Sequence, residues 1–174
     1  MKAKVLVIVP DSGMGGITTS AVNFVNEITK NDYSVDVLVM DGTELPSDNK
    51  YNYIRLSGLS KYWRLGMDSI KSSNKLHLPF LLLLAVLKKI LIRCGGWYPL
   101  VFAGFKTGEY DMAIGYRQSE PCYYFLNKCV KAKRKVALIH GNYRYMDETK
   151  TWDYLLPNFD YVACVSKAIS LDFK

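Results

Sequence analysis

The feature that most constrains the fold is a strand, a glycine loop and a helix close to the N-terminus, within residues 5–28. Five apolar residues at 5–9 predict a strand buried on both faces, and Pro10 ends it because proline has no amide proton to donate. Apolar residues at three- and four-residue spacing in 17–28 predict one face of a helix. Such a unit directs backbone N–H groups and a helix N-terminus at an anion, most often a phosphate. Glycine loops also occur in α/β domains without a ligand beside them, so both interpretations stay open.

Strands and helices are predicted to alternate along the rest of the chain. Residues 57–75 are ambiguous and are interpreted as a basic, aromatic loop or a short helix. Alternating strands and helices form a parallel sheet, so the sequence predicts a doubly wound, Rossmann-like α/β fold with helices on both faces, as one domain spanning residues 1–174. The further strands are expected at 34–40, 53–56, 110–115, 135–139 and 161–165, and the further helices at 78–93, 97–106, 119–130, 148–156 and after Ser166.

Composition narrows the function classes. The hydrophobic share of 49% excludes a disordered chain, and the formal charge of +7 favours an anionic partner without choosing among membrane, phosphorylated ligand and nucleic acid. The basic run at 131–135 follows a predicted helix end, where cations are stabilising, so no nucleic-acid site is predicted from it.

The cysteines and histidines predict no metal site and no disulfide framework, and no cofactor is expected. The four cysteines show no C-x-x-C spacing, and His77 and His140 are far from them in sequence. This pattern fits a reducing compartment. Met-Lys-Ala-Lys leads directly into the first strand without the apolar core of a signal peptide, so a cytoplasmic location is expected.

Three loops are predicted at the carboxyl ends of the strands, where sheets of this kind bind ligands: residues 11–16, 116–119 and 140–142. His140 directly follows the strand at 135–139. Its imidazole could act on a sugar or phosphate as donor, acceptor or base. The alternative is a buried histidine that is hydrogen-bonded to the backbone.

Two other site chemistries have weaker support. Gly13 and Gly15 begin a dinucleotide fingerprint and Asp41 could meet a ribose, but Thr18 takes the third glycine position and the loop is too long. A serine hydrolase would need a G-x-S-x-G elbow, which this sequence lacks, and Ser166 is better explained as the N-cap of a helix.

The helix at 78–93 has two interpretations that can hold together. Its apolar run, residues 78–87, is about half of the ~20 residues that a membrane span needs. The helix therefore packs on the sheet, or it lies partly inserted in a membrane interface, with its cations near anionic head groups. The membrane-facing cations would be Lys88, Lys89 and Arg93.

Several segments in order carry a resemblance to a known family. They are Val-Leu-Val-Ile-Val-Pro with the later Gly-Gly-Ile and Asn-Phe-Val-Asn-Glu, then Tyr-Asp-Met-Ala-Ile-Gly at 110–115, Val-Ala-Leu-Ile-His at 136–140, and Phe-Asp-Tyr-Val-Ala-Cys-Val-Ser at 159–166. Together they resemble the N-terminal domain of family 4 glycosyltransferases, which are retaining, two-domain GT-B enzymes that use nucleotide sugars. The resemblance extends over nearly the whole chain.

The resemblance implies a role for particular residues. His140 would be catalytic and reach the donor sugar, and the glycine pair would lie near the donor phosphates and the acceptor. The ligands would be a nucleotide-sugar donor and a glycan or lipid-linked acceptor, used at the inner face of a membrane. The implied donor- or acceptor-binding residues are Gly15, Gly16, Ile17, Tyr116, Arg117, Gln118 and Asn142.

Two departures from the family bear on activity. Thr18 and Thr19 stand where many members have an acidic residue, and the family's second domain, with its Glu-x7-Glu motif, is absent from these 174 residues. That domain holds most of the nucleotide sugar, so this chain by itself is expected to transfer little or no sugar. The hypotheses left open are a fragment, one subunit of a split enzyme, a non-catalytic membrane-associated binding module and, more distantly, a dinucleotide-binding oxidoreductase.

Overall fold

The computed structural model describes residues 2–9, 11, 15–46, 51–66, 70, 76–141 and 154–172. The chain divides into two compact units, one formed by residues 1–56 together with 106–174 and the other by residues 57–105.

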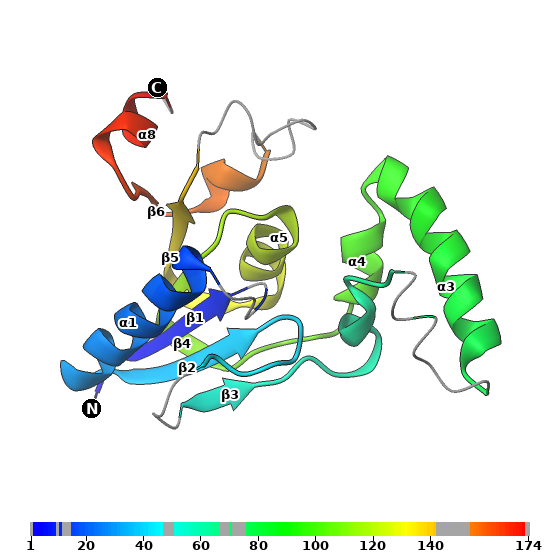
Figure 1. The fold of residues 1–174 in the computed structure, drawn as a ribbon, viewed down its shortest axis with the longest axis horizontal. Coiled ribbons are helices and arrows are strands. Elements are labelled where there is room, and N and C mark those ends of the chain that lie inside the picture. The colour runs from blue at the N-terminus through cyan, green and yellow to red at the C-terminus, as the bar shows by residue number, and fades with distance from the viewer. Residues whose placement is uncertain are drawn as a thin grey trace. The chain divides into compact units, whose positions relative to one another are not determined.

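The first unit is built on a six-stranded sheet in which every pair of neighbours is parallel (Figure 1). The strand order is β3-β2-β1-β4-β5-β6, so the direction of winding reverses between β1 and β4. This confirms the predicted doubly wound, Rossmann-like fold class. The strands are β1 (Lys4–Val9), β2 (Ser34–Val39), β3 (Asn52–Ile54), β4 (Glu109–Gly115), β5 (Lys131–Ile139) and β6 (Tyr161–Cys164).

Helices cover both faces of this sheet because alternate residues of each strand point to opposite sides. Helix α1 (Gly16–Lys30) packs Ala21 and Val25 against the odd-numbered valines of β1. Helix α5 (Glu120–Cys129) lies on the other face, where its Tyr123 ring covers Gly115, the register partner of Ile8. Both helices lie beside the sheet in Figure 1, and the unit also contains a 3-10 turn (Leu156–Asn158) and helix α8 (Lys167–Asp172).

The basic run at 131–135 follows the end of a helix, as predicted, but it lies within a strand, which corrects the explanation of these cations by a helix C-terminus. Helix α5 ends at Cys129 and β5 begins at Lys131, four residues before the predicted start. Cross-strand ion pairs hold this exposed half of β5: Lys133 meets Asp111 at 2.7 Å and Arg134 meets Asp160 at 3.5 Å. Carboxylates far away in sequence, from β4 and from the residue before β6, therefore pair with these cations.

Most predicted helices are present with slightly different ends. Helix α3 (Leu78–Leu91) carries Pro79 in its first turn and continues as a 3-10 turn (Ile92–Cys94), and α4 (Trp97–Val101) is shorter than predicted. Ser166 caps α8 as predicted, since its Oγ accepts a hydrogen bond from the Ile169 amide at 3.3 Å. Most of the helix predicted at 148–156 lies outside the described residues.

In its described residues, the second unit contains a 3-10 turn (Gly58–Tyr62), α3 with the 3-10 turn that continues it, and α4. The buried Trp97 indole donates a hydrogen bond from Nε1 to the Trp63 carbonyl at 2.9 Å. The Lys88 ammonium donates to the Leu65 carbonyl at 2.6 Å and lies 5.8 Å from the centre of the Trp97 ring. Within the ranges that the structure describes, no helix has both the length and the apolar character needed to cross a bilayer.

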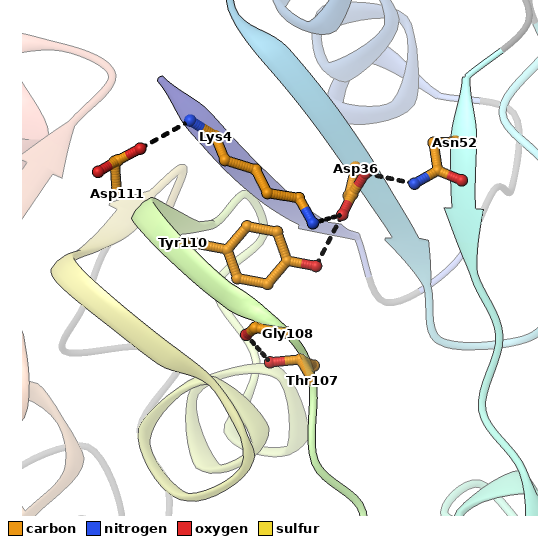
Figure 2. A network of polar contacts seen from close by, with 7 residues as sticks. All are labelled: Lys4, Asp36, Asn52, Thr107, Gly108, Tyr110 and Asp111. Carbon is orange, nitrogen blue, oxygen red and sulfur yellow. Dashed lines mark hydrogen bonds and ion pairs between the residues drawn. The ribbon is translucent and has the colours of Figure 1, made fainter. Parts of the chain in front are cut away.

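A buried carboxylate ties four strands together at the amino ends of β1 and β4. Figure 2 shows Asp36 of β2 meeting side chains from β1, β3 and β4. The Tyr110 hydroxyl donates to Asp36 Oδ2 at 2.8 Å, the Lys4 ammonium lies 3.0 Å from the same oxygen, and Asn52 donates to Oδ1. Burial raises the pKa of Asp36, but the hydrogen bonds from Asn52, Tyr110 and Lys4 outweigh burial and leave its pKa below the usual value.

Candidate functional site

Two of the predicted loops are joined by an ion pair at the carboxyl edge of the sheet. Asp11 follows β1 and Arg117 follows β4, and Arg117 Nη1 donates to Asp11 Oδ2 at 2.7 Å. Both side chains are partly exposed. The pair therefore lies at the strand ends where the winding reverses, which is the place where open α/β sheets bind their ligands.

Tyr116 connects this edge to α1 and to β5. Its amide donates to the Ile8 carbonyl at 2.9 Å, which extends the pairing between β4 and β1 by one residue. Its hydroxyl and the Ser20 hydroxyl form a hydrogen bond at 2.7 Å, and its ring lies 5.3 Å from the His140 ring. Tyr116 is therefore buried and helps to position the loops, and its hydroxyl is already hydrogen-bonded to Ser20.

His140 makes the backbone hydrogen bond that the sequence left as an alternative. Its Nε2 lies 2.6 Å from the Tyr116 carbonyl oxygen, and because a carbonyl only accepts, Nε2 carries the proton. Burial lowers the pKa of His140, and the Arg117 charge acts in the same direction against the opposing hydrogen bond. The ring is therefore neutral at pH 7, and Nδ1 is the nitrogen left to accept a hydrogen bond from a ligand.

Gln118 holds the third loop in place. Its Oε1 accepts hydrogen bonds from the amides of His140 at 3.2 Å and Gly141 at 3.0 Å. Within the described residues, Gln118 Nε2 and Ser119 Oγ are buried without a hydrogen-bond partner. Since buried polar atoms normally find partners, these two are candidates for contact with a ligand or a water molecule. Ser119 occupies the N-cap position of α5 but makes no capping hydrogen bond.

The glycine pair faces open space. A Cβ atom built on Gly15 or Gly16 would meet no described atom within 4 Å. The φ of Gly15 is 174°, an extended conformation that any residue can adopt. Helix α1 begins at Gly16 with no side-chain cap and no acidic residue in its first turn. Packing against the described residues therefore does not require glycine here, whereas close approach of a ligand to the backbone would.

Substitution of Gly15 tests whether the fold itself requires glycine at this position. We expect Gly15→Ala to leave the free energy of unfolding unchanged or to raise it by up to about 1 kcal/mol, because alanine restricts the unfolded chain. The matched control is Gly115→Ala in β4, whose Cβ would lie 3.1 Å from the Tyr123 ring. That overpacking should cost about 1–3 kcal/mol. Urea denaturation followed by circular dichroism measures both free energies of unfolding. A larger loss of stability for Gly15→Ala than for Gly115→Ala would show that the fold does require glycine at position 15.

The remaining predicted site residues lie elsewhere. Ile17 packs against the hydrophobic core around β1, and Asn142 lies outside the described residues. Lys88, Lys89 and Arg93 belong to the second unit. The part of the chain that the structure describes places no group of three or more His, Cys, Asp or Glu side chains where they could hold a metal ion.

Asp11 and Ser20 are site residues that the sequence analysis did not single out. The available signal for Asp11 was an acidic residue two positions after a buried strand, within the predicted loop 11–16, since this places a carboxylate at the edge where ligands bind. Ser20 carried no such signal, because its role depends on the tyrosine that the fold brings to it from β4.

The fold and this site define a Rossmann-like α/β domain with polar side chains gathered at its switch point. Compared with known proteins, the sequence matches no protein-family model, and no curated protein shows significant similarity to it.

Proposed function

We propose that this chain is the acceptor-side half of a retaining nucleotide-sugar glycosyltransferase of the GT-B type. The observation that carries the proposal is the meeting of the glycine loop, residues 116–118 and His140 at the point where the winding of the sheet reverses. These are the three segments that the resemblance to family 4 glycosyltransferases assigns to donor and acceptor.

The geometry supports separate binding positions for the donor phosphates and for the sugar. The N-terminus of α1 supplies positive potential for the donor phosphates, where charge accumulates as the sugar leaves. The partly exposed Arg117 pairs with Asp11 through Nη1, and its guanidinium has further N–H groups that can donate to a phosphate. The neutral His140 ring offers Nδ1 as an acceptor for a sugar hydroxyl, while its Nε2–H is held by the backbone. Gln118 is a positioning residue, because it fixes the backbone of His140 and Gly141.

The dinucleotide-binding alternative has less support. In that class, the acidic residue after the second strand binds the ribose hydroxyls. Here Asp41 Oδ1 accepts hydrogen bonds from the backbone amide of Thr43 at 3.0 Å and from its hydroxyl. The carboxylate therefore serves the turn that follows β2.

A thermal-shift panel tests the proposal. UDP-glucose and GDP-mannose serve as nucleotide-sugar probes and NADH as the dinucleotide probe. A ligand at ten times its dissociation constant adds about 1.4 kcal/mol to the stability. This corresponds to a rise of about 3–6 °C in the melting temperature for a chain of this size. Because the second domain of such enzymes holds most of the donor, the probes are added up to millimolar concentration. We expect such a rise with at least one nucleotide sugar, and neither a rise nor a fluorescence change with NADH.

Variants locate the binding. Arg117→Ala and Gly15→Val should abolish the shift, whereas Arg134→Ala, which breaks an ion pair on β5 with Asp160, should keep it. A response to NADH alone would favour the oxidoreductase. Binding of neither probe class, or equal binding by Arg117→Ala, would contradict the proposal.

A further inference from the structure

Helix α3 exposes a broad apolar face. Its buried residues are Leu81 and Leu84, which lie on one side of the helix. Leu83 and Ile90 on the opposite side are 66% and 61% exposed. Large exposed apolar patches mark surfaces that contact other molecules. The exposed large apolar side chains of α3 and its flanking residues are Leu76, Phe80, Leu82, Leu83, Val86, Ile90 and Ile92.

The charge of the chain is concentrated in the unit that carries this face. Residues 57–105 contain seven Lys and Arg residues and one Asp, a formal charge of +6 out of the total of +7. The other unit is therefore almost neutral in net charge. A partner for this face would have to be apolar where it meets the exposed apolar side chains, and an anionic partner suits the positive charge of the unit.

The cations of α3 are divided between its two sides. Lys89 and Arg93 are exposed, while Lys88 turns inward to the Leu65 carbonyl and the Trp97 ring. Burial lowers the pKa of Lys88. The sequence predicted that all three cations face a membrane. Lys88 departs from this prediction, because its ammonium packs inside the unit. Lys89 and Arg93 lie on the same side of the helix as the exposed leucines, at positions 89 and 93 one turn apart.

We infer that α3 is an interfacial anchor that lies in the surface plane of an anionic lipid bilayer. Its 14 residues make a helix of about 21 Å, shorter than the ~30 Å hydrocarbon core, so it lies along the surface. The exposed leucine face enters the acyl boundary, and Lys89 and Arg93 contact anionic head groups. This inference does not rest on the proposed sugar transfer, since it concerns a different unit of the chain.

Flotation of the whole chain with lipid vesicles tests the inference. The probes are phosphatidylcholine vesicles with and without phosphatidylglycerol. We expect binding to the anionic vesicles that weakens as salt is raised. The Leu83→Ser/Val86→Ser/Ile90→Ser variant should bind at least about a hundredfold more weakly. Lys89→Glu/Arg93→Glu should lose at least about thirtyfold, since each cation near the surface contributes about fivefold.

Matched controls keep the result specific. Leu171→Ser removes an apolar side chain of similar exposure from α8 and should bind like the native chain. Circular dichroism and melting temperature verify that each variant is folded. Failure of the native chain to float, or flotation of the triple serine variant equal to it, would overturn the inference. So would a dimer in sedimentation that the triple variant disperses, because a second copy would then cover this face.

Discussion

Asp36→Ala is expected to lower the free energy of unfolding by about 2–4 kcal/mol. The Asp36 side chain accepts hydrogen bonds from Tyr110 and Asn52 and pairs with Lys4, so one carboxylate connects β1, β2, β3 and β4 (Figure 2). Alanine would leave the Tyr110 hydroxyl buried without its acceptor, while the partly exposed Lys4 regains water. Urea denaturation at pH 7 measures the loss.

The same carboxylate makes the stability depend on pH in one direction. The pKa of Asp36 in the folded protein lies below its unfolded value of about 3.9. A depressed folded pKa contributes stability that is fully present above the unfolded value and disappears as the pH falls through the folded one. The difference between the native chain and Asp36→Asn should therefore be constant from neutral pH to about pH 5 and shrink below about pH 4.

A second carboxylate provides the control for Asp36. Glu109→Ala removes a strongly exposed side chain from β4 that pairs with Lys131 at 3.5 Å. Such surface pairs contribute little, so its denaturation midpoint should stay close to that of the native chain. Equal losses for Asp36→Ala and Glu109→Ala would show that the network does not hold the strands together.

Trp97→Ala is expected to cost about 3–5 kcal/mol in the free energy of unfolding. Trp97 is fully buried in the second unit, its indole N–H is bonded to the Trp63 carbonyl, and the Lys88 ammonium lies near its ring. Among the described residues of that unit, Trp97 is the largest side chain that is fully buried, and its removal leaves a cavity. Urea denaturation measures the cost, and limited proteolysis should place the new cleavage sites within residues 57–105.

Two variants separate the contributions of Trp97. Trp97→Phe keeps an aromatic ring and removes the hydrogen bond to Trp63, so it should cost about 1–3 kcal/mol. Tyr98→Ala changes the neighbouring residue of α4, which is only partly buried, and should cost less than half as much as Trp97→Ala. A loss for Trp97→Ala no greater than that for Tyr98→Ala would refute the central role of Trp97 in this unit.

The sequence by itself determined the class of fold and the edge of the sheet that carries the candidate site. Buried parallel strands are short apolar runs and helices repeat every three to four residues, so β1, α1 and β4 could be predicted from neighbouring residues alone. The carboxyl ends of parallel strands lie at one edge of the sheet. This rule alone predicts that the loops after β1, β4 and β5 lie at the same edge, without any knowledge of tertiary contacts. Ser166 was predicted correctly for the same reason, because a helix cap is a local interaction.

Only the tertiary structure decided which side chains meet. In the sequence Lys131, Lys133 and Arg134 resemble the cations at a helix end, and only the fold brings them their partners. The partners are Glu109 and Asp111 of β4 and Asp160, the residue before β6. Lys88 and Lys89 are adjacent in sequence, yet one packs on Trp97 and the other is exposed, because successive helix residues point about 100° apart. Asp36 and Tyr110 are 74 residues apart, as Asp11 and Arg117 are 106 apart. Local periodicity carries no information about pairing at such separations, since it is the order of the strands in the sheet that brings these residues together.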